Sequence, residues 1–282
     1  MLLRKAAVPL VICRSPRLAA SGRKAGSEGG AAHDLARETL SPLAFGAAAA
    51  KTPLNEGRAM LDLTMNRRRM VDNQIRTADI TSRPLLTAFD ELPREGFLPE
   101  AAQPFAYSDR HLAIGSIEAT GETRYALAPV LVARMLQALE PVSGGKVLHV
   151  ACGTGYASAI LAKLGAAVVA LDEDAKLVAT AEAALVDVKI AGVKTLTGPL
   201  AAGAAAEGPF DAIFMEGAYQ KQPSGLLAQL AEGGRLIGVE GTGRAGQVML
   251  HVKSSGALAA RAVFDASAPL LAAFAAEPQF AF

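Results

Sequence analysis

The sequence contains few of the residues on which disulfide, metal and nucleic-acid functions depend. It has no tryptophan, two cysteines in 282 residues and a formal net charge of only +1. Cys13 and Cys152 lie far apart in different surroundings, so they do not indicate a disulfide framework, and the four histidines show no metal-ligand spacing. A nearly neutral chain has no general attraction for a polyanion. We therefore expect no metal site and no nucleic-acid partner.

Long hydrophobic runs are also absent. No apolar stretch approaches the ~20 residues that a membrane helix needs. Hydrophobic residues still make up 51% of the chain, which is enough for a sizeable core. We expect a cytoplasmic protein that does not enter the membrane and that acts as a monomer.

The first 59 residues differ in composition from the rest of the chain. They are rich in alanine, glycine, serine and arginine, and Glu28 is their first acid. An organelle transit peptide has a similar composition. We favour a low-complexity, disordered extension over residues 1–59, ahead of a true start at Met60 or Met65.

The central feature is a small-residue turn between a predicted strand and a predicted helix. An apolar run ends at Val150, the turn covers Ala151 to Gly155, and a helical pattern follows. Glycines let a ligand approach the backbone, and the free N–H groups that begin a helix favour a carboxylate or phosphate. A second apolar run ends in Asp172 and Glu173, where an acid can accept hydrogen bonds from two ribose hydroxyls. The pattern predicts a nucleotide-type site.

Two classes of cofactor fit such a turn. A dinucleotide fingerprint places Ser158 where a glycine or alanine packs the helix on the strand. A methyltransferase pattern fits from Leu148 to Gly155, with Ala151 where glycine is usual. A tight turn without any ligand is a third interpretation. The turn by itself leaves these alternatives open.

The hydrophobic pattern predicts an α/β fold with a mostly parallel sheet. We expect a helical segment over residues 60–128 and a cofactor-binding core over 129–282. Two late strands predict a C-terminal antiparallel hairpin. The expected strands are 146–150, 167–171, 193–196, 212–215, 235–239, 247–252 and 259–264, and the expected helices are 85–92, 129–139, 157–164, 175–184 and 224–230.

Short motifs in a fixed order carry a resemblance to a known family. They are Met70-Val71, Gln74 and Arg76; Pro93-Arg94-Glu95, Phe97 and Pro99; Tyr107 and Asp109; Leu112 and Ile114-Gly115; Val147 to Tyr156; Pro209 to Ile213; and Pro223, Leu227, Gln229-Leu230 and Gly233 to Leu236. This order resembles the protein-L-isoaspartate O-methyltransferases from about Met65 to Phe264. The resemblance implies a Rossmann-like methyltransferase domain over residues 60–282. It also implies the cofactor S-adenosylmethionine and isoaspartyl-containing proteins or peptides as substrates.

The resemblance also implies a set of cofactor-binding residues. These are Ala151, Gly153, Gly155, Tyr156, Asp172, Glu173 and Glu216. Two departures stand out: His149 occupies the place of a family acid in the first strand, and Pro199 follows Gly198 where the family has a Gly-Asp-Gly turn. We interpret Arg94 and Glu95 as an ion pair that fixes the helical segment.

The loop from Gly121 to Pro129 departs most from the family. The family reads Gly-Gln-Thr-Ile-Ser-Gln-Pro there, and its serine lies near the transferring methyl. Counted forward from Gly121, Thr123 keeps the threonine and Tyr125 replaces the serine; counted back from Pro129, Leu127 takes the serine's place. Methyl transfer to a carboxylate depends on positioning, so we expect Thr123 or Tyr125 to act as the catalytic hydroxyl. The alternative is a degenerate homologue with another acceptor or with a non-catalytic, partner-binding role.

Overall fold

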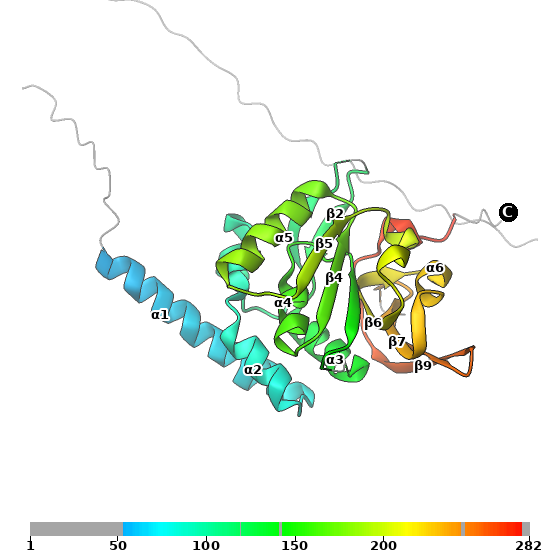
Figure 1. Ribbon diagram of the computed structural model, residues 1–282. Coiled ribbons are helices and arrows are strands. Elements are labelled where there is room, and N and C mark those ends of the chain that lie inside the picture. Colours follow the sequence, from blue (N-terminus) through cyan, green and yellow to red (C-terminus); the bar gives the residue numbers. More distant parts are fainter. Residues whose placement is uncertain (1–52, 119, 141–142, 244–245, 278–282) are drawn as a thin grey trace, which may run out of the picture. The chain divides into compact units, whose positions relative to one another are not determined.

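The computed structural model describes residues 53–118, 120–140, 143–243 and 246–277 (Figure 1). The predicted extension over residues 1–59 falls outside these residues, except that helix α1 (Pro53–Met70) begins before residue 60. The boundary at residue 60 therefore stays a prediction. No helix in the described ranges combines the length and apolar character needed to cross a membrane.

The helical segment consists of short elements that lead to the main sheet. Helix α1 continues into a π-helical turn, η1 (Val71–Ile75), and then a 3-10 turn, η2 (Arg76–Ala78). Helix α2 (Arg83–Glu91) has a proline in its first turn, where a missing N–H has little cost. Two further 3-10 turns follow, η3 (Arg94–Phe97) and η4 (Glu100–Phe105).

A small hairpin separates the helical segment from the sheet. Strands β1 (Leu112–Ser116) and β2 (Thr123–Ala126) pair antiparallel, with an irregularity between Ala113 and Gly115. The expectation that the whole stretch from Gly121 to Pro129 is a loop is wrong, because four of its residues form β2. In a strand, successive side chains point to opposite faces. Arg124 and Ala126 are accordingly buried, whereas Thr123 and Tyr125 are only half-buried.

The main sheet has seven strands in the order β5-β4-β3-β6-β7-β8-β9. Five are parallel, and β8 and β9 add the predicted antiparallel hairpin. Their bounds are β3 Lys146–Val150, β4 Ala167–Asp172, β5 Val193–Thr197, β6 Phe210–Tyr219, β7 Leu230–Glu240, β8 Gln247–Ser254 and β9 Ala257–Asp265. β4 and β5 lie on one side of β3, and β6 and β7 lie on the other, so the strand order switches between β3 and β6. This switch makes the carboxyl ends of β3 and β6 the expected ligand site.

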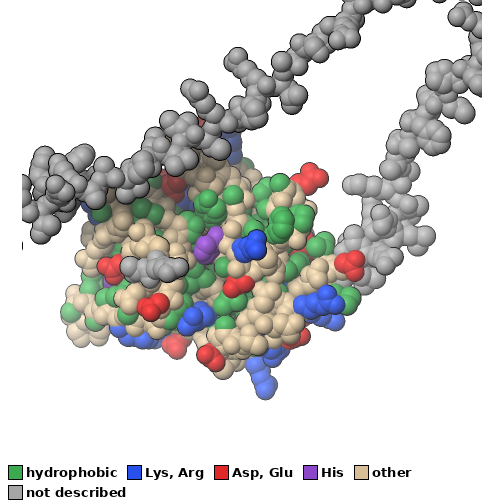
Figure 2. All heavy atoms as spheres, turned by 180° about the vertical axis from the view of Figure 1, so that it is seen from behind, with side chains coloured by type: hydrophobic (Ala, Val, Ile, Leu, Met, Phe, Trp, Pro, Cys, Tyr) green, Lys and Arg blue, Asp and Glu red, His purple; other side chains and the backbone are tan. Residues whose placement is uncertain are grey.

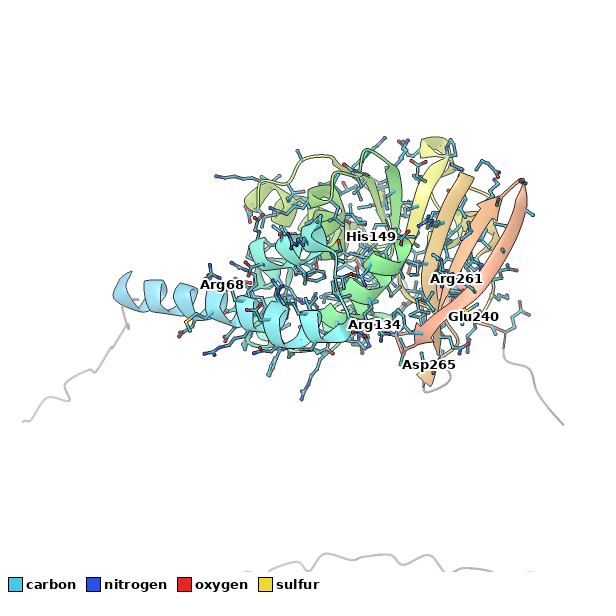
Figure 3. The ribbon with its side chains drawn as sticks, turned by 90° about the horizontal axis from the view of Figure 1, so that it is seen from below. Arg68, Arg134, His149, Glu240, Arg261 and Asp265 are labelled. Atoms are coloured by element: carbon cyan, nitrogen blue, oxygen red, sulfur yellow. The ribbon has the colours of Figure 1, made fainter. Side chains whose placement is uncertain are left out.

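Helices cover both faces of the sheet (Figure 1). One buried cluster contains α3 (Pro129–Leu139), α4 (Tyr156–Lys163) and part of α5 (Ala175–Asp187). The other contains α6 (Ser224–Leu227) and two 3-10 turns, η5 (Leu200–Ala202) and η8 (Ala272–Phe274). On β3, Val147 belongs to the first cluster and Leu148 to the second. By alternation, His149 points toward α4, and it lies inside the protein in Figure 3.

The surface carries both signs of charge. On the face shown in Figure 2, basic and acidic side chains of the described residues are interspersed, with no area dominated by one sign. This distribution agrees with the net charge of +1.

Candidate functional site

The structure brings the predicted turn and the predicted acid together. Gly153 and Gly155 have φ angles of +53° and +89°, in the region that favours glycine. The Gly153 N–H donates to Asp172 Oδ2 at 2.9 Å, and the Cys152 N–H donates to the carbonyl of Leu171 at 3.0 Å. Parallel pairing of β3 and β4 creates this contact between residues 19 positions apart. Ala151, with φ +60°, begins the same turn.

The space next to each glycine is filled by the chain itself. A β-carbon on Gly155 would lie 3.1 Å from the β-carbon of Ala181 in α5, so this glycine allows helix and turn to pack closely. A β-carbon on Gly153 would overlap the end of the Ile114 side chain, which comes from β1. Both glycines are thus needed for packing within the chain, and the expected approach of a ligand to this turn stays a prediction.

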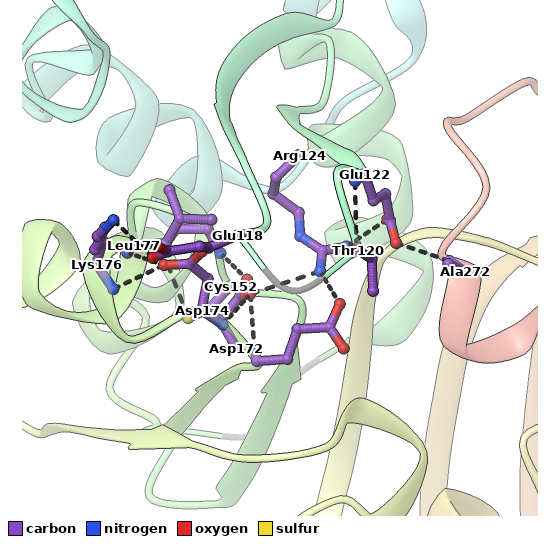
Figure 4. A network of polar contacts seen from close by, with 12 residues as sticks. Glu118, Thr120, Glu122, Arg124, Cys152, Asp172, Asp174, Lys176, Leu177 and Ala272 are labelled. Atoms are coloured by element: carbon purple, nitrogen blue, oxygen red, sulfur yellow. Dashed lines mark hydrogen bonds and ion pairs between the residues drawn. The ribbon is translucent and has the colours of Figure 1, made fainter.

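A buried arginine lies beside the acid of the site (Figure 4). The Arg124 side chain is 1% exposed, and its Nη2 lies 2.7 Å from Glu173 Oε1 and 3.6 Å from Asp172 Oδ1. Its Nη1 donates to Glu122 Oε1 at 3.1 Å. Burial raises the pKa of Glu173, and the Arg124 charge partly offsets that rise.

The Asp172 carboxylate is buried and accepts hydrogen bonds from three backbone N–H groups. Oδ2 accepts from Gly153, and Oδ1 accepts from the N–H groups of Glu173 at 2.8 Å and Asp174 at 3.4 Å. Together with the Arg124 contact, this surrounds both oxygens and leaves the residue 0% exposed. A carboxylate has about four lone-pair sites in total. Among the described residues Oδ2 accepts only from Gly153 and so keeps one unused lone pair, whereas Arg124 lies on the Oδ1 side, 3.6 Å from that oxygen.

A second buried carboxylate, Glu216, lies within β6. Glu216 Oε2 lies 3.0 Å from His149 Nε2, and Glu216 Oε1 accepts from the Leu127 N–H at 3.1 Å. His149 Nδ1 in turn lies 2.7 Å from the Ser158 hydroxyl. The pairing of β6 with β7 is irregular between Phe214 and Ala218, which is common where a strand presents a functional side chain.

This pair accounts for one departure from the family pattern. The resemblance places an acid at position 149, and this chain has histidine there. Glu216 supplies a carboxylate from the neighbouring strand, since Val150 of β3 pairs with Met215 of β6. A carboxylate therefore lies beside the β3 position to which the resemblance assigns an acid, and His149 is its hydrogen-bonding partner.

Tyr156 points away from the Asp172 side of the turn. Its ring packs edge-on against Phe89 and Phe97, and the Arg94 guanidinium lies 4.8 Å from the ring centre. Burial raises the pKa of Tyr156 to about 12. Only the backbone of this residue is therefore available to a ligand in the turn.

The expected ion pair between Arg94 and Glu95 is not among the ion pairs of the described residues. Glu95 accepts a hydrogen bond from the Tyr107 hydroxyl instead. Arg94 is fully buried and donates to the carbonyl of Leu127 at 2.8 Å. Leu127 is thus held on both sides of its backbone, by Arg94 and by Glu216, and its side chain is buried.

The two predicted catalytic residues lie on the other face of β2. Thr123 and Tyr125 alternate with Arg124, so their side chains point away from the carboxylates that Arg124 contacts. The sequence interpretation missed Arg124, His149 as the partner of Glu216, and Ile114. A single charged residue in a stretch expected to be a loop gave no signal that it would turn inward.

Neither a metal nor a reactive thiol is indicated by the described residues. They contain no group of three or more histidine, cysteine or acidic side chains that could hold an ion. Burial, with nearby Asp172 and Glu216, raises the pKa of the Cys152 thiol. Where the family has its second glycine-rich turn, the Gly198 N–H donates to the carbonyl of Asp172 at 2.9 Å, and Leu200 packs in the core.

Comparisons with known proteins agree with this geometry. The family profile described as protein-L-isoaspartate(D-aspartate) O-methyltransferase matches residues 65–265. A protein-L-isoaspartate O-methyltransferase of Koribacter versatilis is 36% identical over 179 residues, which cover 62% of this chain and 78% of the relative. One of Roseiflexus sp. is 33% identical over 202 residues, which cover 72% and 84%.

Two solved structures share the fold. A protein-L-isoaspartate O-methyltransferase superposes with a TM-score of 0.65 at 23% identity, covering 73% of this chain and 65% of the other. A Plasmodium falciparum protein described as such a methyltransferase, in complex with S-adenosyl-L-homocysteine, gives a TM-score of 0.62 at 22% identity and covers 73% and 98%. At these identities the likeness establishes the fold.

Proposed function

The chain belongs to the protein-L-isoaspartate O-methyltransferase family, and on that premise we propose that it methylates the carboxylate of isoaspartyl residues in proteins and peptides. S-adenosylmethionine is the cofactor of this reaction and supplies an electrophilic methyl group on a sulfonium. A carboxylate oxygen of the isoaspartyl residue bonds to the methyl carbon, the carbon–sulfur bond breaks, and its electron pair stays on sulfur. In the product ester the methoxy group is a better leaving group than a carboxylate oxygen, and it departs as methanol when the backbone amide nitrogen closes the succinimide.

The residues of the site fit this cofactor in kind. Asp172, at the end of β4, is the acid for the ribose diol, and Glu173 follows it. The turn from Ala151 to Gly155 carries the methionine part, close to the first N–H groups of α4. Glu216 is a further anion at the same end of the sheet. Arg124 and Ile114 fill the place of the ligand in this conformation and have to move for binding.

Catalysis in this proposal consists of positioning. A carboxylate is already a nucleophile at neutral pH, so the protein has to align it with the methyl group and exclude water. Thr123 and Tyr125 remain our candidates for that role, since both are half-buried and reachable from outside the hairpin. The observation that carries the proposal is the direct hydrogen bond between the glycine turn and Asp172, within a sequence that matches the family over residues 65–265.

A transfer assay tests the proposal. The full chain is incubated with tritium-labelled S-adenosylmethionine and either an isoaspartyl peptide or the same peptide with a normal aspartate. We expect label only in the isoaspartyl peptide, released as methanol by mild base. Equal labelling of both peptides would contradict the acceptor, and cofactor binding without transfer to any peptide would favour a partner-binding role. A monomeric state and a cytoplasmic location also remain predictions.

A further inference from the structure

Arg124 and the proposed cofactor require the same carboxylate. We propose that Arg124 sets the affinity of this chain for its adenosyl cofactor by competing with the ribose for Asp172. This inference rests on the proposed function, because it presumes that an adenosyl group binds at the end of β4. It concerns a residue that the family resemblance does not assign.

The first argument is the number of contacts that hold Arg124. Its guanidinium contacts Glu122, Asp172 and Glu173, and two of these acids lie in the predicted cofactor site. Its contacts with Glu122 and Glu173 are charge-assisted hydrogen bonds, which are stronger than neutral ones, and its contact with Asp172 is an ion pair at 3.6 Å. Its Nε has no hydrogen-bond partner, so the match to these acids is incomplete. Arg124 therefore covers Asp172 while its own Nε stays without a hydrogen bond to any described residue.

The second argument is that Arg124 does not act alone. β1 has a bulge, where Ala113 pairs with Tyr125 and Gly115 with Arg124, so that Ile114 has no partner of its own. Ile114 therefore projects toward Gly153, while the neighbouring Arg124 covers Asp172. The hairpin thus blocks two neighbouring parts of the site, the turn and the ribose acid. One movement of the hairpin would free both.

The third argument concerns the other polar contacts of the hairpin, which involve an exposed ion pair and backbone N–H groups. At its tip, Glu118 pairs with Lys176, but both side chains are more than three-quarters exposed, and such pairs contribute little. Glu122 also accepts from the Ala272 N–H at 3.1 Å, and the Glu118 N–H donates to Asp174 Oδ2 at 3.2 Å. Of the described hairpin side chains, Arg124 is the one that reaches Asp172, and it does so with a buried guanidinium. Opening of the site at Asp172 therefore requires the release of Arg124.

Asp172 remains well supported after Arg124 leaves. Its three backbone N–H donors come from Gly153, Glu173 and Asp174, and none of them belongs to the hairpin. The acid therefore keeps its orientation while one side becomes open to a ribose. An arginine that only supported the structure would be needed to keep Asp172 in place. Because the backbone donors hold Asp172 without Arg124, Arg124 instead has the geometry of a competitor of the ribose.

Calorimetric titration with S-adenosylhomocysteine tests the inference on the full chain. If the closed form dominates, the apparent dissociation constant exceeds the intrinsic one by the inverse of the open fraction. Arg124→Ala should therefore bind at least about tenfold more tightly than wild type. Glu122→Gln removes one partner of Arg124 and leaves Asp172 and Glu173 unchanged, so it should shift affinity in the same direction by a smaller factor. Arg261→Ala, at an exposed position of β9, is the matched control and should bind as wild type does.

The outcomes separate this inference from the proposed function. Tighter binding by Arg124→Ala and Glu122→Gln, with Arg261→Ala unchanged, supports it. If Arg124→Ala does not fold, the direction of the Glu122→Gln effect decides. Binding by wild type that equals or exceeds that of both hairpin variants overturns the inference and leaves the methyltransferase proposal intact. No binding by any of the four proteins overturns both.

Discussion

The buried pair of Glu216 and His149 allows a prediction whose size follows from the structure. Glu216→Ala removes the acceptor of two buried donors, the Leu127 N–H and the N–H at His149 Nε2. A buried donor without a partner costs about 1–3 kcal/mol. We expect the free energy of unfolding to fall by about 2–4 kcal/mol, and the melting temperature by about 5–15 °C for a domain of this size.

Glu216→Gln should behave differently, because the pair can reverse. The amide oxygen can still accept from Leu127, and the amide N–H can donate to His149 Nε2 once the imidazole proton moves to Nδ1. His149 then donates to the Ser158 hydroxyl, so that every polar group keeps a partner. The loss should stay below about 1 kcal/mol.

Urea unfolding and thermal melts of the two variants give the measurement. Glu91→Ala is the control, since it removes only an ion pair in which both side chains are partly exposed, to Lys163. Equal losses for Glu216→Ala and Glu216→Gln would refute the reasoning, because they would show that the charge of Glu216, and not its acceptor atoms, stabilises the fold. A loss in Glu216→Ala no larger than in the control would show that water reaches the site.

Three further predictions follow from other parts of the chain. Thr123→Val and Tyr125→Phe each remove one candidate hydroxyl, and loss of a positioning hydrogen bond of about 1–2 kcal/mol slows methyl transfer about 5- to 30-fold; unchanged rates in both would place the role elsewhere. Burial lowers the pKa of His111, whose Nδ1 accepts from the Ala128 N–H, so its stabilisation is complete above the ordinary pKa of about 6.5 and is lost as the pH falls toward the folded-state pKa. Urea unfolding at pH 7.5 and 5.5 should therefore show a smaller loss on acidification in His111→Gln than in wild type, and equal losses would contradict the assignment. A chain that begins at Met65 should melt within a few degrees of full length and bind S-adenosylhomocysteine equally, because Met65 is half-exposed and the segment before residue 60 lacks a periodic apolar face; a large fall in melting temperature would show that the removed residues pack on the domain.

The sequence predicted the elements that a local pattern of apolar residues or a proline identifies. β3 and α3 have the predicted bounds, Lys146–Val150 and Pro129–Leu139. A central parallel strand is buried on both faces, and its continuous apolar run is recognisable without knowledge of its neighbours. Proline at the start of α3 marks the beginning of that helix in the same local way. The turn and Asp172 were predictable because both belong to one strand–helix–strand unit.

The contacts between distant segments were not predictable from local pattern. His149 and Glu216 are 67 residues apart and become neighbours only because β6 returns to lie next to β3. Each is a polar residue in the apolar interior part of its strand, and two such exceptions are a signal that they pair with each other. Arg124 had no comparable signal. The direction of its side chain depends on the alternation of a four-residue strand that was interpreted as a loop.

In our proposal one site holds an arginine in one state and an adenosyl cofactor in another, and the charges of the site are consistent with both. Glu122, Asp172 and Glu173 converge on Arg124, so the site contains more negative than positive charge even when it is closed. Buried carboxylates without a cation nearby are costly, and the guanidinium lowers that cost while no ligand is present. S-adenosylmethionine carries a sulfonium and can take over part of this role when the hairpin opens. The acids that would attract the cofactor are therefore the same acids that hold the hairpin closed. Added negative charge at these positions would stabilise both the closed state and the cofactor-bound state.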